Sequence, residues 1–437
     1  MPLFRVSSPS TYWARRFSSA AAFFVGSLPV CAMATPEATN AGAASRAVQL
    51  QHVARVELHG AEGVSTDILL SLLPRSTPAD YTEDEFREYQ RRLNNLGLFD
   101  QVAVGLEGNV LVVRLRKKFT LTPALDLSTG RTLADTYLKL GADQYNAFGR
   151  AADLGGYASY SERAPNAEVW YFEHAYDPHR LAPFVGLLYY TSSLRFDHSD
   201  AGWYRRREGG YAGFNLPYGY GSALRFQIGV TVYNESYFDV EGPISPSRGV
   251  YVSEWIQAMW DKYTFRDLAP SGFRVTLYAQ PGALVGPAEV RHKAQFRYLQ
   301  GIPLSETTVI MIQGIGDVAT SGNPNWSALV GSVSGVRGLS DAYYRNNVQG
   351  VANVEFRQAW RFADRWALQG VLFADGAVFR SMDERGRPGD WTRALSTGVG
   401  ARLIPTFLAG LVLRVDSAWL HTPESTWLLQ TGLNQYF

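Results

Sequence analysis

The sequence predicts a mainly β protein: a closed antiparallel transmembrane β-barrel of about sixteen strands, preceded by one small α+β domain. Aromatic residues make up 13% of the 437 residues, and glycine is plentiful at 41. From residue 119 onward, segments of about ten residues alternate apolar or aromatic side chains with small or polar ones, as membrane-spanning strands do. No run of about 18 apolar residues is present, which excludes a helical membrane protein.

The first 34 residues contain the three parts of an export signal in the required order. These are a stretch with three arginines, an apolar run at 20–30 and the small-residue site Ala32-Met33-Ala34. We therefore expect a signal peptide at 1–34, cleaved after Ala34, and a short leader at 35–49. A disordered N-terminal tail is the alternative. A lipoprotein signal built on Cys31 is disfavoured because Val30 stands where that processing needs a small residue.

The charge balance and cysteine content exclude several functions. Residues 1–34 carry three of the 41 basic residues and none of the 40 acidic ones, so the mature chain has 38 basic residues and a formal charge of −2. Nothing in that balance indicates nucleic-acid binding. Because Cys31 leaves with the signal, no disulfide or thiolate metal site is expected. The seven histidines show no metal-ligand spacing and no phosphate-binding loop is present, so we expect no cofactor and no metal.

Residues 50–118 have the pattern of a small α+β domain. A strand is expected at 52–58, followed by a short helix that starts at Ser65 and stops before Pro74. Thr82 and Glu85 form a capping-box pair in front of a second helix, which Gly97 ends. Two strands at 102–106 and 110–115 close the unit around a Gly-Asn turn.

The order strand, helix, helix, strand, strand resembles a POTRA domain. The run at 93–102, Leu-Asn-Asn-Leu-Gly-Leu-Phe-Asp-Gln-Val, is similar to that family's helix-to-strand signature. The resemblance implies a periplasmic domain that receives unfolded client chains, and such a domain can accept an extended peptide along a sheet edge. A small spacer without a client is the alternative.

Residues 119–437 are expected to form the outer-membrane barrel. Sixteen amphipathic segments can be counted, from 121–128 to 427–437. Only a closed barrel satisfies every backbone group in lipid, so an even strand number with both ends in the periplasm is expected. The links at 361–365 and 405–409 are short, as periplasmic turns are. The link at 379–392 and the stretch at 317–347 are long, as outer loops are.

The last segment resembles the signal that outer-membrane barrels present to the barrel-assembly machinery for their own insertion. Gln430, Gly432 and Phe437 fit its polar, glycine and terminal-aromatic positions, while Gln435 stands where a second aromatic is usual. A bacterial outer-membrane location, with membrane lipids as partners, follows from this reading.

The segment Val336-Arg337-Gly338-Leu339 lies in the longest expected outer loop. Here the chain resembles the BamA superfamily, which includes BamA, TamA, two-partner secretion transporters and patatin-linked barrels. In that family an outer loop folds back into the lumen and its Val-Arg-Gly-aromatic tip docks on the barrel wall. This sequence has Leu339 in place of the aromatic.

The corresponding wall motif is Phe373-Ala374-Asp375-Gly376-Ala377, which is similar to the family's Phe-x-Asp-x-Gly pattern with its glycine one position early. Alternation places Phe373 and Asp375 on one face of a strand. An inward Asp375 could form a bidentate contact with an inward Arg337. Glu355, which shares a face with Arg357, is a possible second acceptor.

Three functions remain open from the sequence. The resemblance implies a barrel that assists insertion or translocation of polypeptides, with unfolded chains or a secreted partner as clients. A passive or gated pore is the alternative. An outer-membrane hydrolase built on the 197–200 run Asp-His-Ser-Asp is disfavoured, because adjacent side chains point apart and cannot form a triad. Only some 15 residues separate the cleavage site from the first expected strand, so no hydrolase domain and no enzymatic activity is expected.

Overall fold

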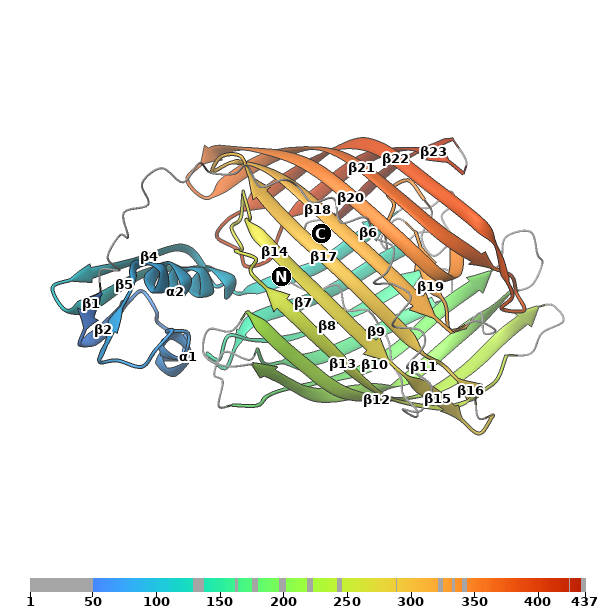
Figure 1. Ribbon diagram of the computed structural model, residues 1–437. Helices are drawn as coiled ribbons and strands as arrows, with labels where there is room; N and C mark the ends of the chain where they lie inside the picture. Colours follow the sequence, from blue (N-terminus) through green and yellow to red (C-terminus); the bar gives the residue numbers. More distant parts are fainter. Residues whose placement is uncertain are drawn as a thin grey trace, which may run out of the picture.

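The structure is a computed structural model, and the residues that it describes form a small N-terminal domain and a large barrel (Figure 1). The described residues are 50–128, 137–161, 164–174, 180–195, 202–217, 223–241, 246–287, 289–320, 325–331, 335–339, 344–423 and 425–433. The expected signal peptide and leader lie outside them, as does Phe437.

The N-terminal domain, residues 50–118, packs two helices against a three-stranded sheet. Its elements are β1 (Gln51–Val53), β2 (Arg55–His59), α1 (Thr66–Ser71), β3 (Ala79–Tyr81), α2 (Glu83–Asn95), β4 (Phe99–Glu107) and β5 (Val110–Lys117). The sheet has the order β2-β5-β4, with β2 parallel to β5, while β1 pairs separately with β3. The short strand β3 was not predicted.

Helix α2 begins where its capping box indicates. The Thr82 side chain accepts a hydrogen bond from the Glu85 amide at 3.2 Å, and the Glu85 carboxylate accepts one from the Thr82 amide at 2.9 Å. Its buried face carries Phe86, Tyr89 and Leu93, which enter the core of the domain. Three residues three or four positions apart therefore fix the helix against the sheet.

In the part of the chain that the structure describes, the barrel consists of sixteen main antiparallel strands, which confirms the predicted fold class and strand number. The strands are β6 (Leu121–Ser128), β7 (Tyr137–Ala147), β8 (Ala152–Ser161), β9 (Ala164–Phe172), β10 (Ala182–Arg195), β11 (Gly202–Pro217), β12 (Leu224–Glu241), β13 (Gly249–Asp261), β14 (Gly272–Gln280), β17 (Lys293–Pro303), β18 (Thr308–Ala319), β20 (Tyr344–Ala363), β21 (Trp366–Met382), β22 (Pro388–Pro405), β23 (Leu413–Thr422) and β24 (Thr426–Leu433). Strand β24 lies next to β6 and closes the barrel.

Three short strands extend the barrel wall beyond its sixteen main strands. They are β15 (Gly282–Val285), β16 (Glu289–Val290) and β19 (Ala328–Val330). Strand β15 follows β14 after Pro281 and continues its pairing with β13, and β19 pairs with the start of β20. Strands β20, β21 and β22 are also longer than the predicted segments. Their ends stay paired with the neighbouring strand beyond the part of the sequence that alternates apolar and polar residues.

Side chains alternate between an apolar outer face and a polar inner face. On β20, Val354 and Phe356 are 45% and 40% exposed, whereas Glu355 between them is fully buried. An outward band of this kind is what hydrocarbon requires, and the charged residues of the same strand then face the lumen. Among the described residues, no helix is long and apolar enough to cross a membrane.

The N-terminal domain lies at one end of the barrel, which we call the domain-side mouth (Figure 1). The junction residue Phe119 donates its amide to the Phe407 carbonyl at 2.8 Å and accepts the Ala409 amide at 3.0 Å. Tyr145 near the end of β7, Ala151 in the following turn and Ala409 belong to the same buried cluster as the core of the domain. The domain is therefore packed on the barrel rim and not only tethered to it.

Candidate functional site: a buried arginine in the barrel lumen

The connection between β18 and β20 carries the loop tip, residues 335–339, against the inner wall of the barrel. Val336 is fully buried and Leu339 is 3% exposed. Both pack in one apolar cluster with Val351, Phe379 and Leu420, which come from β20, β21 and β23. Leu339 therefore occupies a packed position although it is not aromatic.

Gly338 gives the tip its bend. Its φ of +94° lies in the region that side chains disfavour, and a Cβ added there would lie 3.4 Å from the Leu420 Cβ. Because a Cβ at that distance would make ordinary van der Waals contact, the positive φ, and not a lack of space, is what favours glycine at this position.

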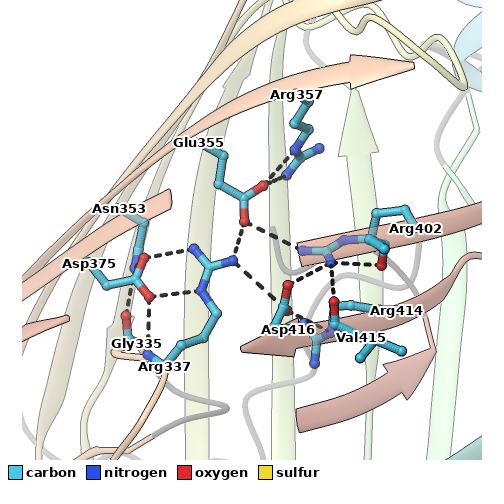
Figure 2. A network of polar contacts seen from close by, with 11 residues as sticks. Gly335, Arg337, Asn353, Glu355, Arg357, Asp375, Arg402, Arg414, Val415 and Asp416 are labelled. Carbon is cyan, nitrogen blue, oxygen red and sulfur yellow. Dashed lines mark hydrogen bonds and ion pairs between the residues drawn. The ribbon is translucent and has the colours of Figure 1, made fainter. Parts of the chain in front are cut away.

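Arg337 is fully buried and its guanidinium meets two carboxylates (Figure 2). Its Nε and Nη2 atoms donate to the two oxygens of Asp375, each at 2.8 Å, and its backbone amide donates to Asp375 Oδ2 at 3.1 Å. Its Nη1 atom donates to Glu355 Oε1. The guanidinium also lies 3.5 Å from the ring centre of Phe373. A bidentate pair with a second acceptor fixes both the position and the orientation of the arginine.

Asn353 ties the loop backbone to the same carboxylate. It lies directly opposite Asp375 in the β20–β21 register, and both side chains face inward. Its Nδ2 atom donates to Asp375 Oδ1 at 2.9 Å and to the Gly335 carbonyl at 2.6 Å. The loop tip is therefore held at two nearby points, through its backbone at Gly335 and through its side chain at Arg337.

A wider ionic network surrounds this contact (Figure 2). Arg357 donates to Glu355 Oε2 at 2.6 Å, and Arg402 donates to Asp416 Oδ1 at 2.6 Å. Arg414 lies 3.5 Å from Asp416 Oδ2. Together with Arg337, Glu355 and Asp375, these residues place four arginines beside three carboxylates. Charges that are removed from water need such paired surroundings, because an isolated charge there is costly.

Two glycines on β22 make room for the network. A Cβ at Gly398 would lie 2.3 Å from the Phe373 ring, and one at Gly400 would lie 2.1 Å from Asp416 Oδ1. Their absence of a side chain lets Phe373 lie beneath Arg337 and lets Asp416 reach Arg402. The Gly-Val-Gly spacing is the signal in the sequence that could have identified this wall.

The same connection has a second anchor on another part of the wall. The Trp326 indole donates to the His292 carbonyl at 2.9 Å, and its ring lies 5.4 Å from that of Tyr251. Asn325 accepts a hydrogen bond from the Trp203 indole at 2.8 Å through its side chain, and its carbonyl accepts one from Arg205. The connection is thus attached to β11 and β13 near its start and to β20–β23 near its tip.

The residues singled out from the sequence fall into three groups. Val336, Arg337, Gly338, Leu339, Phe373, Asp375 and Glu355 lie together at the loop tip. Gln430 and Gly432 lie on β24, where they pair in register with Asp416 and Arg414 of the surrounding network. Phe437 and the 197–200 run of the hydrolase alternative lie outside the described residues.

Several residues of the network were not singled out from the sequence. Arg402 and Asp416 are examples, and both are fully buried in the described structure. Their signal was a charged residue on the inward-facing positions of otherwise apolar strands. In the part of the chain that the structure describes, no group of three His, Cys, Asp or Glu side chains could hold a metal ion.

A membrane-type barrel with a loop held inside its lumen is the class that this geometry defines. No family model and no curated protein sequence matches the chain. Solved structures do match. A BamA from Haemophilus ducreyi lacking POTRA domains 1–3 is 13% identical with a TM-score of 0.50, and the match covers 88% of this chain and 83% of that one.

Two CdiB structures are also similar. CdiB from Acinetobacter baumannii is 13% identical with a TM-score of 0.58, over 88% of this chain and 74% of that chain. CdiB from Escherichia coli is 10% identical with a TM-score of 0.54, over 91% and 93% of the two chains. At these identities the likeness concerns the fold, so the resemblance to the BamA superfamily is confirmed as a shared barrel architecture.

Proposed function

We propose that this chain is a bacterial outer-membrane barrel that assists the insertion or translocation of polypeptides. In this proposal the N-terminal domain, residues 50–118, is a POTRA-like periplasmic domain that receives clients. Arg337, held by Asp375 and Glu355, keeps the loop folded into the lumen. The clients are unfolded chains or a secreted partner, and the protein has no catalytic role.

The observation that supports the proposal most strongly is that Arg337 is bonded to two carboxylates, those of Asp375 and Glu355. A plain pore needs charges on its wall, but it does not need a loop tip whose arginine is fully buried and bonded to wall carboxylates. Ordering a loop costs conformational entropy, and burying ionic groups costs solvation free energy. A contact with both costs is therefore expected where the function requires the loop to adopt a single position. The similarity of the fold to BamA and CdiB supports the same reading.

The N-terminal domain adds a second line of support. In its described sheet, β2 and β4 are edge strands. An exposed edge can take up an extended peptide by continuing the backbone hydrogen bonds of the sheet. The domain also packs on the barrel rim, so a peptide bound there would be delivered close to the domain-side mouth.

The test compares a deletion strain complemented with the wild-type protein, with Arg337→Met, or with a variant lacking residues 50–118. Arg387→Met is the matched control, because Arg387 forms an exposed pair with Asp383 in the β21–β22 turn. We expect the first two variants, but not the control, to lower the amounts of a subset of outer-membrane or secreted proteins. Quantitative proteomics of membrane and medium fractions measures this.

The pore alternative makes a different prediction for the same variants. If both variants reach the membrane in normal amounts and leave every outer-membrane and secreted protein unchanged, the proposal is wrong. A large, steady single-channel conductance that does not change when residues 50–118 are removed would then favour a plain pore.

A further inference from the structure

A second segment enters the lumen, at the end opposite to the loop tip. Residues 262–271, which we call the mouth plug, join β13 to β14 at the domain-side mouth. Thr264 and Ser271 close its base by donating their amides to each other's carbonyls, at 2.7 and 3.1 Å. The plug is therefore a folded segment and not an open turn.

The mouth plug reaches across several strands of the inner wall. Leu268 is 3% exposed and belongs to one buried cluster with Ala359 on β20, Ala367 on β21 and Ile404 on β22. Its carbonyl accepts a hydrogen bond from Gln369 at 3.1 Å. Because β13 and β14 supply the plug and β20–β22 supply these contacts, the plug extends along the inner wall from β14 to β22.

The nearer wall also contacts the plug. Tyr263 and Ala269, exposed by 1% and 2%, share a second cluster with Val309 and Met311 of β18. Both clusters consist of inward-facing wall residues and plug residues, so the plug covers wall that would otherwise face the lumen water.

Helix α2 of the N-terminal domain holds the outer side of the mouth plug. Asn95, its last residue, donates to the Tyr263 carbonyl at 2.7 Å and accepts the Phe265 amide at 2.7 Å. Arg91, one turn earlier, donates to the same carbonyl at 3.1 Å. One amide side chain of the domain thus bonds two backbone groups of the plug.

A further tie comes from the last residue of the domain, Lys118, which follows β5. Lys118 has a side chain that is 1% exposed, and its Nζ donates to Asp267 Oδ1 at 2.7 Å. The ties from α2 and from Lys118 depend on the domain staying at the mouth. They would be lost together if the domain moved away from it.

We propose that the mouth plug is a gate of the domain-side mouth, and that α2 is its latch through Asn95. When the domain is docked, the plug is held closed against the wall. When α2 is displaced, the plug loses its outer contacts and the wall beneath it opens to water. The gate is independent of the proposed handling of clients, because it requires only that residues 262–271 restrict access to the lumen at the domain-side mouth.

Thiol labelling of a covered wall position tests the gate directly. Ala359 is 2% exposed beneath the plug, so Ala359→Cys should react slowly with a charged, membrane-impermeant maleimide in the full chain reconstituted in phosphatidylcholine vesicles. Asp364→Cys, whose native side chain is 83% exposed, gives the rate of an accessible thiol on the same side.

Asn95→Ala is the latch variant and Asn94→Ala is its matched control. Asn94 is one position earlier on α2 and donates only within the helix, to the Gln90 carbonyl at 3.0 Å. Because Asn95→Ala removes two hydrogen bonds to the plug, we expect the thiol introduced by Ala359→Cys to be labelled about tenfold faster in that background. The rate with Asn94→Ala should stay at the starting value.

Asp267→Asn removes the ion pair with Lys118, the second tie between domain and plug, and leaves α2 intact, so it should also speed the labelling. Equal labelling in Asn95→Ala, Asp267→Asn and the starting protein would overturn the proposal. Equal acceleration by Asn94→Ala and Asn95→Ala would overturn it too, because the effect would then come from the helix and not from the latch.

Discussion

Replacing Arg337 by methionine should release the loop tip from the barrel wall. Methionine keeps most of the aliphatic length but removes the donors to Asp375 and Glu355. Removing one partner of a buried ion pair costs about 3–5 kcal/mol, since it leaves the other partner without its counter-charge. Each 1.4 kcal/mol is a factor of ten, so the ratio of docked to undocked tip should fall by roughly 10²- to 10⁴-fold.

A disulfide reports the docked tip without disturbing the ionic contact. A Cβ built at Gly335 lies 3.5 Å from the Val351 Cβ, which is within the Cβ separation that disulfides adopt. The pair Gly335→Cys and Val351→Cys should therefore oxidise readily in intact membranes when Arg337 is present. The chain's one native cysteine, Cys31, lies outside the described residues and is replaced by serine.

The controls decide how the result is read. Moving the wall cysteine to Ala352, whose side chain faces the other side of the strand, should abolish cross-linking. Arg387→Met should leave it unchanged, because exposed pairs contribute only about 0–1 kcal/mol. If Arg337→Met cross-links as fast as the starting protein, packing alone holds the tip and the reasoning about the ionic contact is refuted.

Three further predictions concern other parts of the chain. Gly338→Ala should weaken docking by about 1–2 kcal/mol, since L side chains disfavour its positive φ, and a lower yield of the same disulfide would measure this. Trp326→Ala should free the second anchor of the connection and speed hydrogen exchange of residues 325–331, whereas unchanged exchange would show that this anchor is not needed. Although burial opposes it, hydrogen bonds from Arg91 and Arg92 hold the pKa of Glu88 below its usual range. The stabilisation by ionised Glu88 is fully present above the unfolded pKa of about 4.3 and is lost as the pH falls through the folded pKa. In the wild-type protein, the protection of α2 amides from hydrogen exchange, corrected for the pH dependence of exchange itself, should therefore decrease at acidic pH. In Glu88→Gln this decrease should be smaller.

The architecture of the barrel could be predicted because lipid imposes strong rules on sequence. Side chains of each spanning strand must alternate between lipid and lumen, and each backbone group must be hydrogen-bonded. Alternating segments of about ten residues separated by turn residues were therefore enough to count sixteen strands. The short strands outside this pattern were not predicted. β15 and β16 form a hairpin that extends the wall, and its pattern does not differ from that of a loop.

Only those residues of the candidate site that belong to short family motifs could be predicted from the sequence. Arg337 and Asp375 were singled out through a family pattern, and their role as a lock stays a prediction. Arg402 and Asp416 belong to the same network, yet each looks alone like an ordinary lumen charge. Their pairing depends on register between β22 and β23, which a single sequence does not specify. The mouth plug was not predicted for a similar reason, because one wall residue that bonds to it, Gln369, lies 101 positions later in the chain.

The two carboxylates that accept hydrogen bonds from the Arg337 guanidinium follow it in the chain. Glu355 and Asp375 lie 18 and 38 positions later, on strands that are neighbours in sequence and in space. Strands β20 and β21 form one hairpin, so the two carboxylates that bind Arg337 are brought together by a pairing that closes only a short loop. This pairing does not depend on the contact between β24 and β6 that closes the barrel. The binding position of Arg337 is thus encoded locally, within 38 residues of the arginine itself.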